Sequence, residues 1–276
     1  MTRPLILVTN DDGIASPGLW ASARAADALG EVWVVAPARQ WTGAGRCMLA
    51  GLSGTATRVP PSAERPWPAY QVDATPAQTV QIALLQLLPR QPALVISGIN
   101  AGENVGIGIT ISGTVGAALE AAAFEIPALA ASLEADAEHH TAHEPRLDFR
   151  VAAHFVSLFA REILTRQGLP PGVDVLKIDV PHDATPATPW RVVRLSRKRY
   201  YRAVPVPNGL PAYARRDNPE DVFEPDSDAY TLQVLREVPV VPLSADLTAY
   251  GALDTVRAWF QAGRSTPANL VQESKA

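Results

Sequence analysis

The stretch that decides the fold is "LILVTNDDGIASPGLWASARAADALGEVWVVAP", residues 5–37. It begins with four aliphatic residues, which predict a strand buried on both faces. "GLWASARAADAL", residues 18–29, has apolar side chains at the i, i+3, i+4 and i+7 spacing of an amphipathic helix, and "EVWVVAP", residues 31–37, predicts a second strand. A strand, a helix and a strand in this order form a β-α-β unit, which indicates a parallel sheet.

The same alternation continues along the chain. "TPAQTVQIALLQLL", residues 75–88, predicts a helix, and "PALVISGIN", residues 92–100, predicts a strand. A further helix is expected from about Gly113 to Phe124, followed by the strand-like "PALAAS", residues 127–132. The pattern predicts an α/β fold whose mainly parallel sheet is covered on both faces, and such sheets bind ligands at the carboxyl ends of their strands.

After about residue 185 the composition and the hydrophobic pattern of the sequence change. "VPVPNGLPAYARRDNPEDVFEPDSDAY", residues 204–230, is rich in proline and turn residues and has no regular period. It predicts extended hairpins that project as an arm, followed by a short strand, "EVPVVPL", and a helix, "DLTAYGALDTVRAWFQ". We therefore expect a core over residues 1–185, and an arm with a C-terminal helix over residues 186–276 that completes the core.

Composition excludes several classes of protein. The formal net charge of −4 argues against a nucleic-acid polymer as the main partner, because binding to its backbone needs a basic surface. The longest apolar stretch after the first strand is interrupted by Glu120, Glu125 and Pro127, so we expect no membrane-spanning helix. Cys47 is the only cysteine, which rules out a disulfide within the chain and fits a cytoplasmic location.

Two adjacent carboxylates, Asp11 and Asp12, directly follow the first predicted strand. Like charges repel, and neither a strand end nor the turn at Gly13 requires both of them, so a divalent cation bound by their oxygen atoms would explain the pair. The alternative is an ordinary turn, because aspartate before glycine is common in turns.

A second motif, "SGINAGENVGIGITISGTVGAALEAAAF", residues 97–124, contains six glycines and opens a helix at Ser112-Gly113-Thr114. Glycines allow close approach of an anion, and the amides of a helix N-terminus favour phosphate. The alternative is a plain glycine-rich loop in which Ser112 caps the helix. Because both motifs follow strands, they should meet at one edge of the sheet, which favours a metal held against a phosphate.

The five histidines all lie outside these two motifs, which disfavours a histidine phosphoenzyme and a Ser-His-Asp hydrolase. His139, His140 and His143 have a spacing that could bind a metal, but they stand in a polar segment that we interpret as a solvated loop.

Four segments together resemble the SurE family of survival-protein nucleotidases: "ILVTNDDGIASPGL", "VVAPARQWTGAG", "SGINAGENVG" and "SGTVGAALEA". They occur in the family's order within the first 132 residues. The resemblance implies a three-layer α/β/α Rossmann-like fold with a C-terminal hairpin arm. It also implies a divalent-metal-dependent phosphomonoesterase that hydrolyses nucleoside 5'- and 3'-monophosphates, and in many members short polyphosphate.

The resemblance also implies the site residues. By this resemblance the metal, Mg²⁺ or Mn²⁺, is expected to be bound by Asp11, Asp12, Thr42 and Asn100. The phosphate is expected to be bound by Asn104, Ser112, Gly113 and Thr114. Asp11 and Asn100 are the expected catalytic residues. Asp11 would orient or deprotonate the attacking water, or attack phosphorus itself, and Asn100 would stabilise charge on the phosphate oxygens.

This chain departs from the family pattern at several positions. Thr42 stands where serine is usual, Ala38 replaces an acidic residue, and Tyr250 replaces a frequent histidine. The loop before Ser112 carries isoleucines where polar or aromatic residues are common: Ile107, Ile109 and Ile111. These changes leave open a non-catalytic nucleotide-sensing or scaffold protein on the same fold. A dinucleotide or nucleotide-sugar enzyme is disfavoured because its glycine fingerprint is missing.

The arm and C-terminal helix resemble segments that the family exchanges between subunits, which implies a homodimer or homotetramer. Trp259 and Phe260 could pack in that interface, or could equally cover the sheet of their own subunit.

Overall fold

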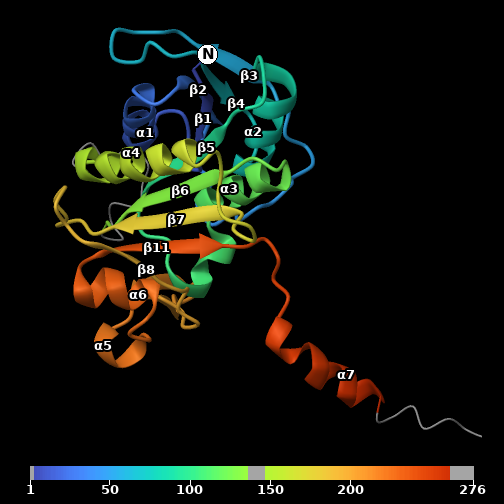
Figure 1. Ribbon diagram of the computed structural model, residues 1–276, viewed down its shortest axis with the longest axis vertical. Coiled ribbons are helices and arrows are strands. Elements are labelled where there is room, and N and C mark those ends of the chain that lie inside the picture. The colour runs from blue at the N-terminus through green and yellow to red at the C-terminus, as the bar shows by residue number, and fades with distance from the viewer. Residues whose placement is uncertain (1–2, 136–146, 262–276) are drawn as a thin grey trace, which may run out of the picture. The chain divides into compact units, whose positions relative to one another are not determined.

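The computed structural model describes residues 3–135 and 147–261 (Figure 1). The chain forms two compact units, Met1–Ser244 and Ala245–Ala276. The first unit contains the sheet and the helices that cover it. In the second, a short 3₁₀ turn, Tyr250–Ala252, leads into helix α7, Leu253–Gln261.

The first unit is built on a nine-stranded sheet with the order β3-β4-β2-β1-β5-β6-β7-β11-β8. Neighbouring strands from β4 to β7 are parallel, whereas β3 pairs with β4 and β11 pairs with β7 in antiparallel fashion. The strands are β1 Leu5–Thr9, β2 Glu31–Pro37, β3 Ala56–Val59, β4 Ala69–Val72, β5 Leu94–Ala101, β6 Ala128–Leu133, β7 Val175–Val180, β8 Trp190–Val192 and β11 Val238–Leu243. The predicted mainly parallel sheet is confirmed.

Helices cover both faces of this sheet, as Figure 1 shows. On one face α1, Pro17–Asp27, packs against α4, Arg150–Thr165. On the other, α2, Pro76–Ile82, with its π-helical extension Ala83–Leu87, packs against α3, Gly113–Ala123.

Successive residues of β1 divide between the two hydrophobic cores that these helices create. Ile6 and Val8 belong to the core beneath α1 and α4, and Leu7 belongs to the core beneath α2 and α3. Successive side chains of a strand point to opposite faces, so a strand between two helical layers must be aliphatic throughout. The three-layer α/β/α architecture expected from the resemblance is therefore present.

The part of the chain beyond residue 185 contributes to the same sheet through β8 and β11. It also forms the expected hairpin, a separate two-stranded antiparallel sheet of β9, Tyr201–Val204, and β10, Ala212–Arg215. Two short helices follow, α5, Pro219–Val222, and α6, Asp228–Tyr230, the second extended by a π-helical turn, Thr231–Leu235.

Helix α4 and strands β3 and β4 were not among the elements expected from the sequence. In α4 the signal was present, since Phe155, Phe159 and Ile163 recur four residues apart and all three are buried. His139, His140 and His143 lie outside the described residues. No helix in the described part of the chain is long and apolar enough to cross a membrane.

Candidate active site

A tight turn at the end of β1 places the two aspartates. The side chain of Asn10 donates from Nδ2 to the carbonyl oxygen of Gly13 at 3.1 Å and accepts from the Gly13 amide at 3.2 Å. Gly13 has φ +91°, and a Cβ there would lie 3.0 Å from the backbone carbon of Arg39. Only glycine fits this conformation so close to a second segment of backbone, which explains the residue after the acidic pair.

Asp11, which follows β1, contacts the N-terminus of α3. The hydroxyl of Thr114 donates to its Oδ1, and the Asp11 carboxylate lies directly against Gly113. Burial raises the pKa of Asp11 to about 6, although the Thr114 hydroxyl and the amides of Gly113 and Thr114 oppose that rise by hydrogen bonding to the carboxylate. The first aspartate and the helix start that were expected to share one edge of the sheet are therefore in contact.

Asp12 contacts the end of β5 and the loop after β2. Its Oδ2 accepts the amide of Ala101 at 3.2 Å, and its Oδ1 accepts Nε2 of Gln40 at 3.3 Å. The same Gln40 nitrogen donates to the hydroxyl of Thr42 at 2.8 Å. Burial, followed by the negative charge of Asp11, raises the pKa of Asp12 to about 8. Gln40 and the Ala101 amide are site contacts that the sequence motifs did not identify.

Asn100 stands next to Ala101 at the carboxyl end of β5. The pairing of β5 with β6 shifts register between Ser97 and Asn100, which breaks the regular strand just before the site. The Nδ2 atom of Asn100 donates to the carbonyl oxygen of Gly102 at 2.7 Å. This contact orients the carboxamide and leaves Oδ1 as the atom that can coordinate a cation.

The other predicted phosphate residues differ in what they already bind. The hydroxyl of Ser112 accepts the amide of Val115 at 3.1 Å, so it caps α3. Asn104 donates from Nδ2 to the hydroxyl of Ser132 at 2.9 Å, and its backbone amide donates to Asp179 at 2.7 Å. The backbone amide of Asn104 is therefore already bound to a carboxylate, just as the amides of Gly113 and Thr114 are bound to Asp11.

The donor set fits a hard divalent cation. Within residues 3–135 and 147–261, no lysine or arginine forms an ion pair with Asp11 or Asp12, although both carboxylates are buried. Two adjacent buried carboxylates without a counter-charge are unfavourable, as the raised pKa of each one indicates. Carboxylate, carboxamide and hydroxyl oxygens are the ligands that Mg²⁺ and Mn²⁺ prefer.

A second acidic cluster lies at the ends of β6 and β7. Ligand atoms of Glu134, His182 and Asp183 lie within 4.8 Å of one another. The Nη2 atom of Arg236 contacts all three, at 2.6 Å from Glu134, 2.5 Å from Asp183 and 3.1 Å from Nδ1 of His182. Burial would raise the pKa of Glu134, but hydrogen bonds from Arg236 and His182 outweigh it and lower the pKa to about 2. A guanidinium therefore already supplies the positive charge in this cluster.

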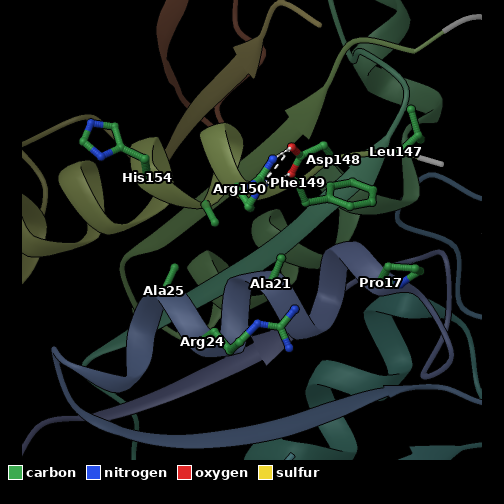
Figure 2. Close-up of a pocket in the computed structure, with 10 residues that line it drawn as sticks. Pro17, Ala21, Arg24, Ala25, Leu147, Asp148, Phe149, Arg150 and His154 are labelled. Carbon is green, nitrogen blue, oxygen red and sulfur yellow. Dashed lines mark hydrogen bonds and ion pairs between the residues drawn. The ribbon is translucent and has the colours of Figure 1, made fainter. Parts of the chain in front are cut away.

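A groove of about 490 Å³ runs between α1 and the start of α4 (Figure 2). Figure 2 shows Arg24 on α1 and, on the other side of the groove, Asp148 paired with Arg150 at the start of α4. None of the residues expected in the active site lines it. The chemistry at the ends of β1 and β5 is therefore separate from this groove.

Comparison with known proteins agrees with this geometry. The family model for survival protein SurE matches residues 6–202. The chain is 43% identical over 256 residues to the 5'-nucleotidase SurE of Thermococcus kodakarensis, covering 91% of this chain and 96% of that protein. It is 40% identical over 254 residues to 5'-nucleotidase SurE 1 of Thermus thermophilus, covering 91% and 96%.

The crystal structure of the SurE protein from Aquifex aeolicus superposes with a TM-score of 0.71 at 29% identity, covering 93% of this chain and all of that one. Sequence and fold thus agree over nearly the whole length of these relatives, and the chain belongs to the SurE family.

Proposed function

We propose that this protein is a divalent-metal-dependent phosphomonoesterase that hydrolyses nucleoside 5'- and 3'-monophosphates to nucleoside and phosphate. One observation carries the proposal: two buried carboxylates without a cationic side chain, Asp11 and Asp12, lie where β1 meets the N-terminus of α3. The site thus offers a place for a cation beside a place for an anion, and a phosphate ester bound to a metal needs both. The relatives named 5'-nucleotidase support the same substrate class.

Asp11, Asp12 and Asn100 would hold the cation, with Thr42 as a fourth oxygen ligand. We propose Mg²⁺ or Mn²⁺, because every donor in this set is an oxygen atom. When bound, such an ion supplies charge neutralisation for the phosphate and increases the acidity of a coordinated water.

The chain's own residues perform the positioning. Thr114 donates to Oδ1 of Asp11 and so orients the carboxylate that would accept a hydrogen bond or a proton from the attacking water. The positive end of α3, at Ser112 to Thr114, favours the negative charge that builds up on the phosphate oxygens. Asn100, oriented by its contact with Gly102, contributes a polar group next to Ala101, whose amide binds Asp12.

We further propose that the protein acts as a homodimer or homotetramer formed by exchange of the C-terminal arm. Helix α7 supports this because it carries four large apolar residues at helical spacing: Leu253, Val256, Trp259 and Phe260. The single cysteine, Cys47, supports a cytoplasmic location.

The test is phosphate release from nucleoside 5'- and 3'-monophosphates and from short polyphosphate, with Mg²⁺ or Mn²⁺ and again with a chelator. Metal-dependent release from a nucleoside monophosphate, abolished by the chelator, is the expected result. Binding of nucleotides without release of phosphate would instead favour the sensing or scaffold function that the departures at Ala38 and around Ile109 leave open.

A further inference from the structure

A lysine with no exposed surface, Lys177, lies in the middle of β7, two residues before Asp179 near the carboxyl end of the strand. Lys177 forms ion pairs with Asp179 on the same strand and with Asp228, the latter at 3.3 Å between Nζ and Oδ2, and all three side chains are 0% exposed. Burial would lower the pKa of Lys177, but the charges of the two aspartates outweigh it and raise the pKa. The lysine is therefore a charged group in the interior, and such groups are costly unless their partners are well placed.

Both aspartates use further contacts to hold the glycine-rich loop. Oδ1 of Asp179 accepts the amide of Asn104 at 2.7 Å, and Oδ2 of Asp228 accepts the amide of Gly106 at 2.9 Å. These contacts join residues 75 and 122 positions apart in the sequence. Hydrogen bonds to ionised acceptors are stronger than those to neutral ones, so the charge state of this triad bears directly on the loop.

The loop leaves little freedom at these two points. A Cβ on Gly106 would lie 2.8 Å from the carbonyl oxygen of Lys198, and the residue has φ +59°. The side chain of Asn104 is held separately by Ser132. A 3₁₀ segment, Gly106–Ile111, begins at Gly106 and leads into Ser112 and the N-terminus of α3. A displacement at Asn104 and Gly106 would therefore be passed on to the phosphate-binding segment.

We infer that Lys177 is a positioning residue: by pairing with Asp179 and Asp228, it fixes the backbone from Asn104 to Gly106 and with it the phosphate-binding segment at Ser112 to Thr114 that follows. The inference rests on the proposed nucleotidase function. It assigns the triad to the phosphate side of the site, since in the described part of the chain the side-chain hydrogen bonds of Asp11, Asp12 and Asn100 involve none of its members. Phosphate binding should accordingly depend on the triad, and metal binding should not.

The decisive variant is the double substitution Lys177→Met/Asp179→Asn. The triad carries one positive and two negative charges, and the variant retains only Asp228, so the net charge stays at −1. The matched control is Arg191→Met/Glu237→Gln, which also removes one positive and one negative partner, paired at 2.8 Å with no side-chain hydrogen bond to the loop within the described residues. Wild type and both variants would be compared for kcat and KM with a nucleoside monophosphate, inhibition by inorganic phosphate, and Mn²⁺ affinity by calorimetry.

The expected result is a tenfold or greater loss of kcat/KM and a tenfold weaker inhibition by phosphate in the triad variant, with Mn²⁺ affinity within twofold of wild type and the control unchanged. Wild-type kinetics and phosphate inhibition in the triad variant would overturn the inference, as would an equal loss of Mn²⁺ affinity. If the double variant does not fold, Asp179→Asn alone decides. A threefold or greater loss of kcat/KM at unchanged Mn²⁺ affinity supports the inference, and wild-type values overturn it.

Failure of the proposed function gives a different result, because wild type itself would then release no phosphate. Calorimetric binding of inorganic phosphate in the presence of Mn²⁺ would still test the triad. Equal binding by wild type and variant, or no binding by either, would overturn the inference.

Discussion

Replacing Gly113 with alanine would test the contact between the acidic pair and α3. A Cβ at this position would lie 2.6 Å from Cβ of Asp11 and 2.7 Å from its Oδ2, whereas ordinary contacts begin at 3.4 Å. The two groups must therefore separate by about 1 Å, and a displacement of that size in a catalytic group costs about 100-fold in rate. By the rate equation this corresponds to about 2.7 kcal/mol of barrier.

The same variant should remain folded. Strain from the extra methyl costs about 1–3 kcal/mol, and alanine in place of glycine in a helix returns up to about 1 kcal/mol. For a chain of this size we expect a fall in Tm of no more than about 8 °C, with the fold retained.

The matched control is Gly108→Ala. It lies in the same glycine-rich segment, but a Cβ there would meet no atom within 4 Å. Steady-state kinetics should show a loss of about 100-fold in kcat/KM for Gly113→Ala and wild-type values for Gly108→Ala. If Gly113→Ala keeps kcat/KM within threefold of wild type, the carboxylate of Asp11 is not held in a required position by α3.

Four further predictions concern the acidic pair, the charged cluster at Glu134 and the core. Asp11→Asn should abolish phosphate release while the circular dichroism spectrum is unchanged; full activity would remove Asp11 from the mechanism. In metal-free protein the pKa of Asp11 is about 6 and that of Asp12 is about 8, both above the ordinary value of 3.8. The folded state therefore binds more protons than the unfolded state between these pH values, so the free energy of unfolding should fall as the pH rises from about 4 to 8. Mn²⁺ should therefore raise Tm more at pH 8 than at pH 5, and equal shifts at the two pH values would contradict this. The pKa of Glu134 is lowered to about 2, so the contribution of its carboxylate to the free energy of unfolding is present above pH 4.5 and is lost as the pH falls toward 2. Urea unfolding should therefore show that Glu134→Gln destabilises the protein at pH 7 and much less near pH 2. Phe155→Ala on α4 should lower the free energy of unfolding by about 3–5 kcal/mol without changing KM, and a loss below 1 kcal/mol would mean that this helix does not bury its apolar face in the core.

The alternation of strands and helices from β1 to β6, apart from β3 and β4, could be predicted because each of these elements has a local signal, whereas β7 was not predicted. The run Leu5–Val8 is aliphatic at every position, since β1 is covered on both faces, and residues 18–29 show a helical period. Strands β3 and β4 have four residues each and lie at one edge of the sheet, where partial exposure dilutes the apolar pattern. Short edge strands like these carry too little periodicity to be recognised.

From the sequence it could be predicted only that the site residues lie at the same edge of the sheet. Motifs placed Asp11 after one strand and Thr114 at a helix start, and parallel topology brings both to the carboxyl ends of the strands. Which atoms touch depends on register and loop path, and neither has a local signal. The contact of Gln40 with Asp12 therefore appears only in the structure.

The charged clusters were even harder to predict from the sequence. Glu134 and Arg236 are 102 positions apart, and the amide of Gly106 is 122 positions from Asp228. No periodicity within either segment indicates such a partner. Contacts between segments so far apart in the sequence become visible only once the fold has brought those segments together.

The central claim is that Asp11 and Asp12 hold a divalent cation against a phosphate. The most direct measurement is calorimetric titration of metal-free protein with Mn²⁺, for wild type and Asp12→Asn, with phosphate release from a nucleoside monophosphate measured on the same samples. We expect one Mn²⁺ per chain in wild type, and loss of both the binding and the phosphate release in Asp12→Asn. Undiminished Mn²⁺ binding and phosphate release by Asp12→Asn would contradict the account.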